Sequence, residues 1–226
     1  MSTATIPPPY ATDEDIALRA SADFTLLCPR DQKVASGSDG AFSASAPWTL
    51  TSASADFQAL GVTAGQVVQV RATGQAAPED FVVVGTAPGA VTLRRKGQPA
   101  GVGMPPGTAG PSGVRFNILT LGPQIALASA DINHRFGITN GLYPGHVAAE
   151  LADPTELRDA VVLTVLYRQY LAVSREAAPS EEFAAKAQAV KADLDDLLAR
   201  LALHWNRVSG GDIDPITTRF GTRMSR

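Results

Sequence analysis

The segment "DPTELRDAVVLTVLYRQYLAVSR", residues 153–175, sets the fold class of the C-terminal half of the chain. It opens like a helix N-terminus: Asp153 suits the capping position, Pro154 the first helical position and Glu156 the third. Residues 160–167 are almost all apolar, whichever helical face they occupy. A helix that is apolar all round must be covered on every side, so the sequence predicts a buried central helix.

Two further helices are predicted beside this one. The segment "GPQIALASADINHRFG", residues 122–137, has Pro123 at a first helical position and Gly137 at a C-cap position. A third helix starts at Ser180 and places one apolar face against the central helix. That face comprises Phe183, Val190, Leu194, Leu197, Leu201 and Trp205. The core of the resulting bundle should contain Leu163, Leu166 and Leu197.

The part of the chain from residue 37 to 121 has a different character. Short apolar runs alternate there with glycine and proline, which is typical of a small barrel or curled sheet. The runs are "WTLT" (48–51), "QVVQV" (66–70), "FVVV" (81–84), "VTLRR" (91–95) and "VRFNIL" (114–119). Residues 96–113 are too rich in glycine and proline for a strand and are predicted to form a loop.

The predicted fold class is α+β: a helical bundle with an inserted small β-barrel-like module and extended N- and C-terminal arms. Thr12 should cap a short helix with acidic residues in its first turn. The expected domains are an arm at 1–11, a bundle formed by 12–36 and 122–206, a β module at 37–121 and a docking tail at 207–226.

Composition restricts the function. A formal net charge of −3 argues against a protein that binds nucleic acid through overall charge. The single cysteine, Cys28, excludes an internal disulfide, and the N-terminus lacks the pattern of a secretory signal. No apolar run is long enough to span a bilayer, so we expect a soluble protein of intracellular origin with no membrane partner.

The residues that could carry chemistry are scattered. His134, His146 and His204 lie in three separate segments, and Asp131 stands one helical turn from His134 as a surface pair. Cys28 lies in apolar company and is expected in the core. No nucleophile motif or phosphate loop is present. We therefore expect no cofactor, no metal and no enzymatic activity.

Two charged runs have simple interpretations. The acidic residues Asp193, Asp195 and Asp196 are expected on a solvated helix face. Arg94, Arg95 and Lys96 form the only basic run of the β module, expected at a strand end that faces solvent or a partner.

The helical segments carry a resemblance to a known family. The segments "LGPQIALASADINHRFG", "LRDAVVLTVLYRQYL" and the helix 181–205 resemble the helical core of head–tail connector proteins of tailed bacteriophages, also called adaptor or head-completion proteins. The opening "YATDEDIALRASADF" resembles the start of that family. The resemblance covers about half of the chain, and the module at 37–121 departs from the smallest family members.

The resemblance implies a structural role in the virion. Such proteins form rings, usually of twelve subunits, that dock beneath the portal protein and continue the DNA channel toward the tail. The implied partners are other copies of the chain, the portal, a tail-side or stopper protein, and DNA that passes without sequence-specific binding. The implied location is the virion neck, after synthesis in the host cytoplasm.

The C-terminal tail is expected to bind the portal, as extensions do in several family members. Ile213, Ile216 and Phe220 would supply apolar anchors, and the arginines would contact acidic groups. These arginines are Arg219, Arg223 and Arg226. The competing interpretation is a frayed terminus without function.

Three other functions remain open from sequence. The chain could be a stopper or tail-terminator protein, whose barrel rather than bundle forms the ring. It could be a cellular binding module of β and helical parts, or an enzyme with an unrecognised site.

Overall fold

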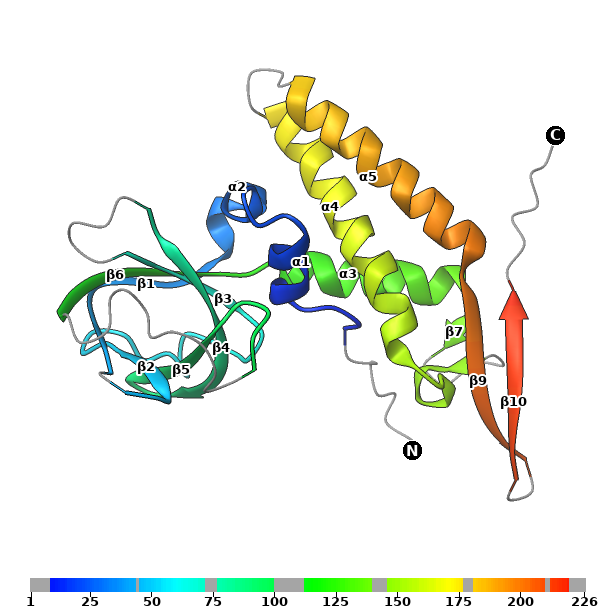
Figure 1. Ribbon diagram of the computed structural model, residues 1–226, viewed down its shortest axis with the longest axis horizontal. Helices are drawn as coiled ribbons and strands as arrows, with labels where there is room; N and C mark the ends of the chain where they lie inside the picture. The colour runs from blue at the N-terminus through cyan, green and yellow to red at the C-terminus, as the bar shows by residue number, and fades with distance from the viewer. Residues whose placement is uncertain are drawn as a thin grey trace. The chain divides into compact units, whose positions relative to one another are not determined.

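The computed structural model describes residues 9–43, 45–71, 77–99, 112–139, 146–176, 181–209 and 212–219. Of these, residues 176, 206–209 and 212–219 are described through their backbone alone. The chain divides into two compact units. Residues 12–122 form one unit, and residues 123–226 together with 1–11 form the other. The fold is mixed α+β, as predicted, with a barrel in the first unit and most of the helix in the second (Figure 1).

Six antiparallel strands close into a barrel in the order β1-β2-β5-β4-β3-β6. The five runs predicted as strands all lie in it, which confirms the barrel-like module. The strands are β1 (Lys33–Phe42), β2 (Trp48–Thr51), β3 (Val67–Arg71), β4 (Glu79–Ala87), β5 (Ala90–Arg95) and β6 (Ser112–Leu119). Strand β6 closes the barrel because it pairs with β1 on one edge and β3 on the other.

Strand β1 was not predicted, since "SGSDG" within it suggests a turn. The two glycines serve close packing instead. A Cβ on Gly37 would lie 2.6 Å from the ring of Phe116, and one on Gly40 would lie 2.8 Å from the carbonyl oxygen of Val114. Glycine in a strand often marks such a close approach. The sheet therefore starts at Lys33, within the segment assigned to the bundle from sequence.

Side chains fill the interior of the barrel. One cluster of buried apolar residues joins all six strands and includes Leu50, Val68, Phe81 and Phe116. The rings of Phe57 and Phe116 pack with centroids 5.6 Å apart. A barrel this small has room for its own side chains only, so it is a packed core and no channel.

Two short helices, α1 (Asp13–Arg19) and α2 (Phe24–Leu27), belong to the barrel unit, although residues 12–36 were assigned to the bundle from sequence. Thr12 caps α1 as predicted, in a reciprocal capping box with Asp15. The two ends of the unit are tied together by Asp13, whose carboxylate accepts bonds from Leu121 N at 2.6 Å and Thr120 Oγ1 at 2.7 Å. A single 3-10 turn, η1 (Arg30–Gln32), leads into β1.

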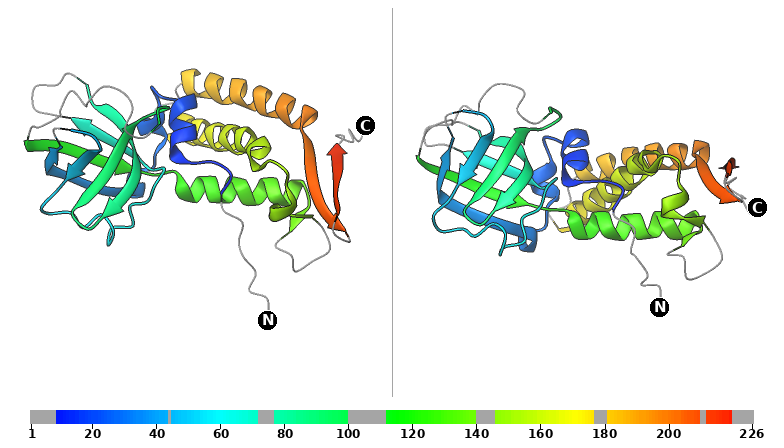
Figure 2. Two further views of the ribbon diagram at one scale, coloured as in Figure 1. Left: turned by 60° about the horizontal axis from the view of Figure 1, so that its bottom comes forward. Right: turned by 90° about the horizontal axis from the view of Figure 1, so that it is seen from below.

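Three long helices dominate the second unit: α3 (Gly122–Arg135), α4 (Arg158–Glu176) and α5 (Glu181–Arg200). Helix α4 lies between α5 and α3 (Figure 2). Every residue from Ala160 to Leu166 is buried, including Leu163 and Leu166, which confirms the predicted burial of this helix. None of the described helices is both long and apolar enough to cross a membrane.

Shorter elements join these helices. A parallel pair, β7 (Ile138–Thr139) and β8 (His146–Val147), follows α3. The 3-10 helices η2 (Ala148–Glu150) and η3 (Pro154–Leu157) then lead into α4, and the carboxylate of Asp153 accepts the backbone N–H of Thr155 at 2.8 Å. Asp153 is therefore the N-cap, as predicted, although it opens a 3-10 turn ahead of the α-helix, and the Glu156 carboxylate contacts His204 instead of completing the expected capping box.

Helix α5 ends at Arg200, so the prediction of a helix through Trp205 was wrong. Leu197, expected in the core, is only half-buried, whereas Leu198 is buried. The next residues form a strand with Leu203 and Trp205 fully buried. The segment "LALHW" was ambiguous because Leu201 and Trp205 fit a helical spacing while Leu203 and Trp205 fit strand alternation.

Candidate partner-binding site at the C-terminal hairpin

The predicted docking tail begins inside a β-hairpin. Strand β9 (Ala202–Ser209) pairs antiparallel with β10 (Asp212–Arg219) through eight residue pairs. The structure places Ile213, Ile216 and Arg219 on β10, where their backbone partners are Val208, Trp205 and Ala202. The other expected docking residues, Phe220, Arg223 and Arg226, lie outside the described residues.

Strand β9 is held on its second edge by the segment before α4. Leu151 forms a bridge with Trp205, and Ala152 N donates to the carbonyl oxygen of His204 at 2.8 Å. The first half of β9 is therefore bonded on both edges. It forms the fixed base of the hairpin.

Trp205 is the centre of this base. Its side chain is fully buried, and the ring of His146 stacks on it with centroids 4.1 Å apart and planes 14° from parallel. The indole N–H has no hydrogen-bond partner among the described groups. Packing and stacking therefore hold the indole, and they outweigh the cost of an unpaired buried donor.

Two glutamates on the 3-10 helices contact the histidines of the base. His204 Nδ1 lies 2.6 Å from Glu156 Oε1, and His146 Nδ1 lies 3.5 Å from Glu150 Oε2. Each pair joins one histidine to one carboxylate, and no group of three or more potential metal ligands occurs in the described part of the chain. These histidines thus fix β9 against the helical unit.

The register of the hairpin shows which edge Pro215 faces. His204 lies opposite Thr217, yet its backbone groups bond to Ala152 and Glu156 rather than to β10. Antiparallel pairs alternate between hydrogen-bonded and non-hydrogen-bonded, so the pair two positions along, which contains Pro215, is also non-hydrogen-bonded. The proline nitrogen therefore lies on the outer edge of β10, where it limits the addition of another full-length strand.

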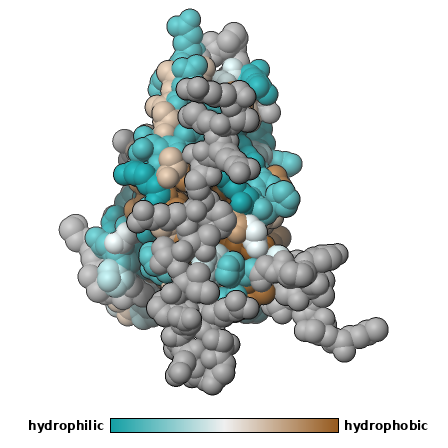
Figure 3. Space-filling view, turned by 90° about the vertical axis from the view of Figure 1, so that its right-hand side faces the viewer, coloured by the Kyte–Doolittle hydropathy of each residue, from teal (hydrophilic) through white to brown (hydrophobic). Residues whose placement is uncertain are grey.

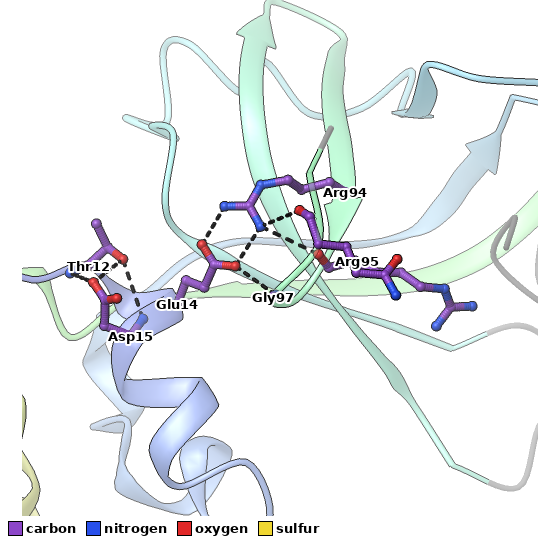
Figure 4. A network of polar contacts seen from close by, with 7 residues as sticks. Thr12, Glu14, Asp15, Arg94, Arg95 and Gly97 are labelled. Atoms are coloured by element: carbon purple, nitrogen blue, oxygen red, sulfur yellow. Dashed lines mark hydrogen bonds and ion pairs between the residues drawn. The ribbon is translucent and has the colours of Figure 1, made fainter. Parts of the chain in front are cut away.

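The basic run of the barrel is neutralised by acidic partners, of which Figure 4 shows Glu14 beside Arg94. Arg94 forms a two-pronged ion pair with Glu14, and Gly97 N donates to the same carboxylate at 2.9 Å. Burial alone would raise the pKa of Glu14, but these hydrogen bonds lower it below its usual value.

The other two cations of the run are paired as well. Arg95 lies 3.1 Å from Glu79, and Lys96 lies 3.2 Å from Asp80. The run therefore stabilises the fold around β5 and is a poor candidate for binding phosphate.

The other residues singled out from sequence have structural contacts too. Asp131 pairs with Arg168 of α4 at 2.6 Å rather than with His134. Burial, with a contribution from Asp13, raises the pKa of the Cys28 thiol to about 12, so the thiol stays protonated and is no nucleophile at neutral pH. The acidic run on α5 includes Asp195 and Asp196, which pair with basic residues one turn away.

No family model, no curated protein and no solved structure matches this chain. The functional argument accordingly rests on the residues and contacts described above.

The hairpin was missed from sequence although a signal for it exists. Gly210 and Gly211 follow "LHW" (203–205), where two apolar residues flank a polar one, and precede "DIDPITT" (212–218), which is rich in β-branched residues. A Gly-Gly pair between two segments of strand-type composition is typical of a β-hairpin. The glycines were interpreted as the end of ordered structure because the preceding run had been assigned to a helix.

Proposed function

We propose that the protein is a virion structural protein that forms a ring adaptor between the portal and the tail of a tailed bacteriophage. In this proposal α3, α4 and α5 form the helical bundle of each subunit, the ring continues the DNA channel, and the chain has no enzymatic role. The basis is the resemblance of the helical segments and of residues 10–24 to head–tail connector proteins.

The observation that supports docking most strongly is the fixed base of the C-terminal hairpin. Strand β9 is bonded to the segment before α4 and buries Trp205, whereas β10 pairs only with β9 among the described strands. Because β9 is fixed at its base, β10 and the residues that follow it can contact a partner while the helical unit stays folded. The portal is the proposed partner of β10 and of the residues that follow it.

The barrel has a separate part in this proposal. Its interior is a packed core, so DNA would pass through the ring of subunits and never through a barrel. Its outer surface is then available for the tail-side or stopper protein. This arrangement fits an insertion into the helical unit, because Asp13 brings the two ends of residues 12–122 together.

Capture by the purified portal tests the docking. Three chains are compared: the full chain, a chain ending at Arg219, which keeps the hairpin, and a chain ending at Ser209, which keeps β9 and Trp205. We expect both truncated chains to keep the melting temperature of the helical unit and to bind the portal about tenfold more weakly or worse, as for lost interface anchors.

A pair of point variants separates specific docking from loss of charge. Arg219→Ala should weaken capture, whereas Arg30→Ala, at an exposed position of the barrel unit, should leave capture unchanged. Equal capture of all three chain lengths would refute the docking proposal and favour a terminus without function.

A further inference from the structure

The charged residues of α5 pair with one another. Lys186, Lys191 and Arg200 each lie beside a carboxylate one helical turn away. Figure 3 shows mildly hydrophobic residues among the hydrophilic ones over the upper part of that view, where α5 lies. Opposite charges at this spacing attract each other and stabilise the helix. The outer surface of the barrel carries a pair of like charges instead.

Arg71 and Arg115 lie side by side on the outside of the barrel. They are partners in the register of β3 with β6, and both are exposed. Their strand neighbours Val70, Val114 and Phe116 belong to the barrel core, so the two arginine side chains point outward. Among the strand pairs that the structure describes, this is the one position where two like charges stand directly opposite each other.

This arrangement costs stability in the free chain. Directly opposite residues of an antiparallel pair have Cβ atoms about 5 Å apart, so two like charges at such a position repel each other and destabilise the sheet. Proteins break local rules of this kind mainly at functional sites. A carboxylate between two guanidinium groups removes the repulsion, because each guanidinium then has an opposite charge beside it. The pair therefore favours the binding of an anion.

The acidic residues nearest to the pair are bound elsewhere. Asp39 lies in the stretch of β1 that faces Arg115, but its carboxylate accepts hydrogen bonds from residues 52–54. Asp80 of β4 is already in an ion pair, at 3.2 Å. Arg115 takes part in no ion pair with another described residue. Arg71 has interactions of its own, so Arg115 is the guanidinium available to a partner.

The outward positions next to the pair are polar and uncharged. Ser36 and Asn117 stand opposite each other on β1 and β6, and both are exposed. Hydroxyl and amide groups donate to the same oxygens that a guanidinium binds with two parallel hydrogen bonds. We infer that this face of the barrel, centred on Arg115 and Arg71, binds the carboxylates of an acidic segment of another protein.

An acidic protein segment fits this face better than DNA does. Binding to DNA is driven by counterions released at several phosphates, each neutralised by a cation. The pair supplies two cations, in a chain whose formal net charge is −3. In the proposed ring the acidic segment would belong to the tail-side or stopper protein, and that assignment rests on the proposed function. Carboxylate binding by the pair is a property of the single chain and does not depend on a ring.

Two measurements on the full chain test the inference, with Arg115→Gln as the test variant. The matched control is Arg30→Gln, which removes the same charge at an exposed position of the same unit. Arg30 lies before the start of β1, whose first residue pairs with Leu119, about 13 Å along β6 from Arg115. In urea unfolding followed by the nuclear magnetic resonance signals of the barrel amides, Arg115→Gln should raise the midpoint at low salt by about 0.1–0.5 M, because the repulsion is removed. The control should leave the midpoint unchanged.

The second measurement titrates each chain with an eight-residue glutamate peptide and follows the amide signals of β3 and β6. For the unaltered chain we expect a Kd of about 1 mM at low salt, as for a few charge-assisted hydrogen bonds at an exposed position. Arg115→Gln should bind the peptide about tenfold more weakly or worse, the effect of losing one two-pronged contact, whereas Arg30→Gln should bind it like the unaltered chain. A short DNA duplex of equal charge and inorganic phosphate should both bind more weakly than the peptide.

Four results would overturn the inference: a midpoint that falls or stays unchanged in Arg115→Gln, no peptide binding at millimolar concentration, equal weakening in the test variant and the control, or tighter binding of the duplex or of phosphate than of the peptide. Tighter binding of the duplex would assign the face to DNA instead. Both measurements use the single chain, so a failure of portal capture or of ring formation would leave their outcomes unchanged.

Discussion

Replacing Asp13 with asparagine should remove a pH-dependent loss of stability from the barrel unit. Asp13 is 4% exposed and accepts hydrogen bonds from Leu121 N and Thr120 Oγ1. Burial disfavours the charged carboxylate more than these bonds favour it, so the pKa of Asp13 is raised to about 6 from its ordinary value of 3.8.

The direction of the effect follows from proton binding. Between pH 3.8 and about 6 the folded state holds a proton on Asp13 that the unfolded state has lost, so the free energy of unfolding falls as pH rises through this window. A shift of about two pKa units at about 1.4 kcal/mol per unit gives a loss of about 3 kcal/mol, complete above pH 6.

The assay is urea unfolding at several pH values, with nuclear magnetic resonance titration of the Asp13 carboxyl carbon as a direct check. The stability of the Asp13→Asn chain relative to the natural one should rise by about 2 kcal/mol between pH 4 and pH 7, because part of the total loss has already occurred at pH 4. Asp31→Asn, at an exposed position of the same unit, is the control and should show no such change. A carboxyl titrating near pH 4, or parallel stability curves for Asp13→Asn and the natural chain, would refute the reasoning.

Three further predictions follow from burial. Leu166→Ala should lower the free energy of unfolding by about 2–5 kcal/mol, measured by denaturation, because the α4 core would keep a cavity. Trp205→Ala should cost about 3–5 kcal/mol in the same measurement. Trp205→Phe should cost clearly less, since it keeps a stacking ring and removes the unpaired N–H, and equal losses for both variants would contradict this view of the indole. Cys28 should react with a thiol reagent at pH 8 only after unfolding, and rapid labelling of the native chain would contradict its raised pKa.

The elements with unmistakable patterns were predictable from the sequence. The all-round apolar run of α4 can only be buried, and the five barrel runs are separated by turn residues. In contrast, β1 contains glycines whose packing role becomes visible only beside Phe116 and Val114. Strand β9 was not predicted from the sequence because the four-residue spacing of Leu201 and Trp205 suits a helix as well as a strand.

The base of the hairpin could not be predicted for a different reason. His204 meets Glu156 across 48 positions of sequence, and no local pattern reports such a contact. The acidic partners of the basic run are distant too, since Arg94 meets Glu14 from 80 positions away. Which charges neutralise each other is decided by the closing of the barrel and the packing of α1 against it.

The clasp that Asp13 forms with residues 120 and 121 bears on how such a chain could arise. A folded segment whose two ends lie close together costs the rest of the chain about as much conformational entropy as a short surface loop does, because the ends are already held together. Residues 12–122 thus have the form that an inserted domain requires, with both of their ends at one place. A chain in which residue 11 is joined to residue 123 through a few glycines would show whether the helical unit folds without them.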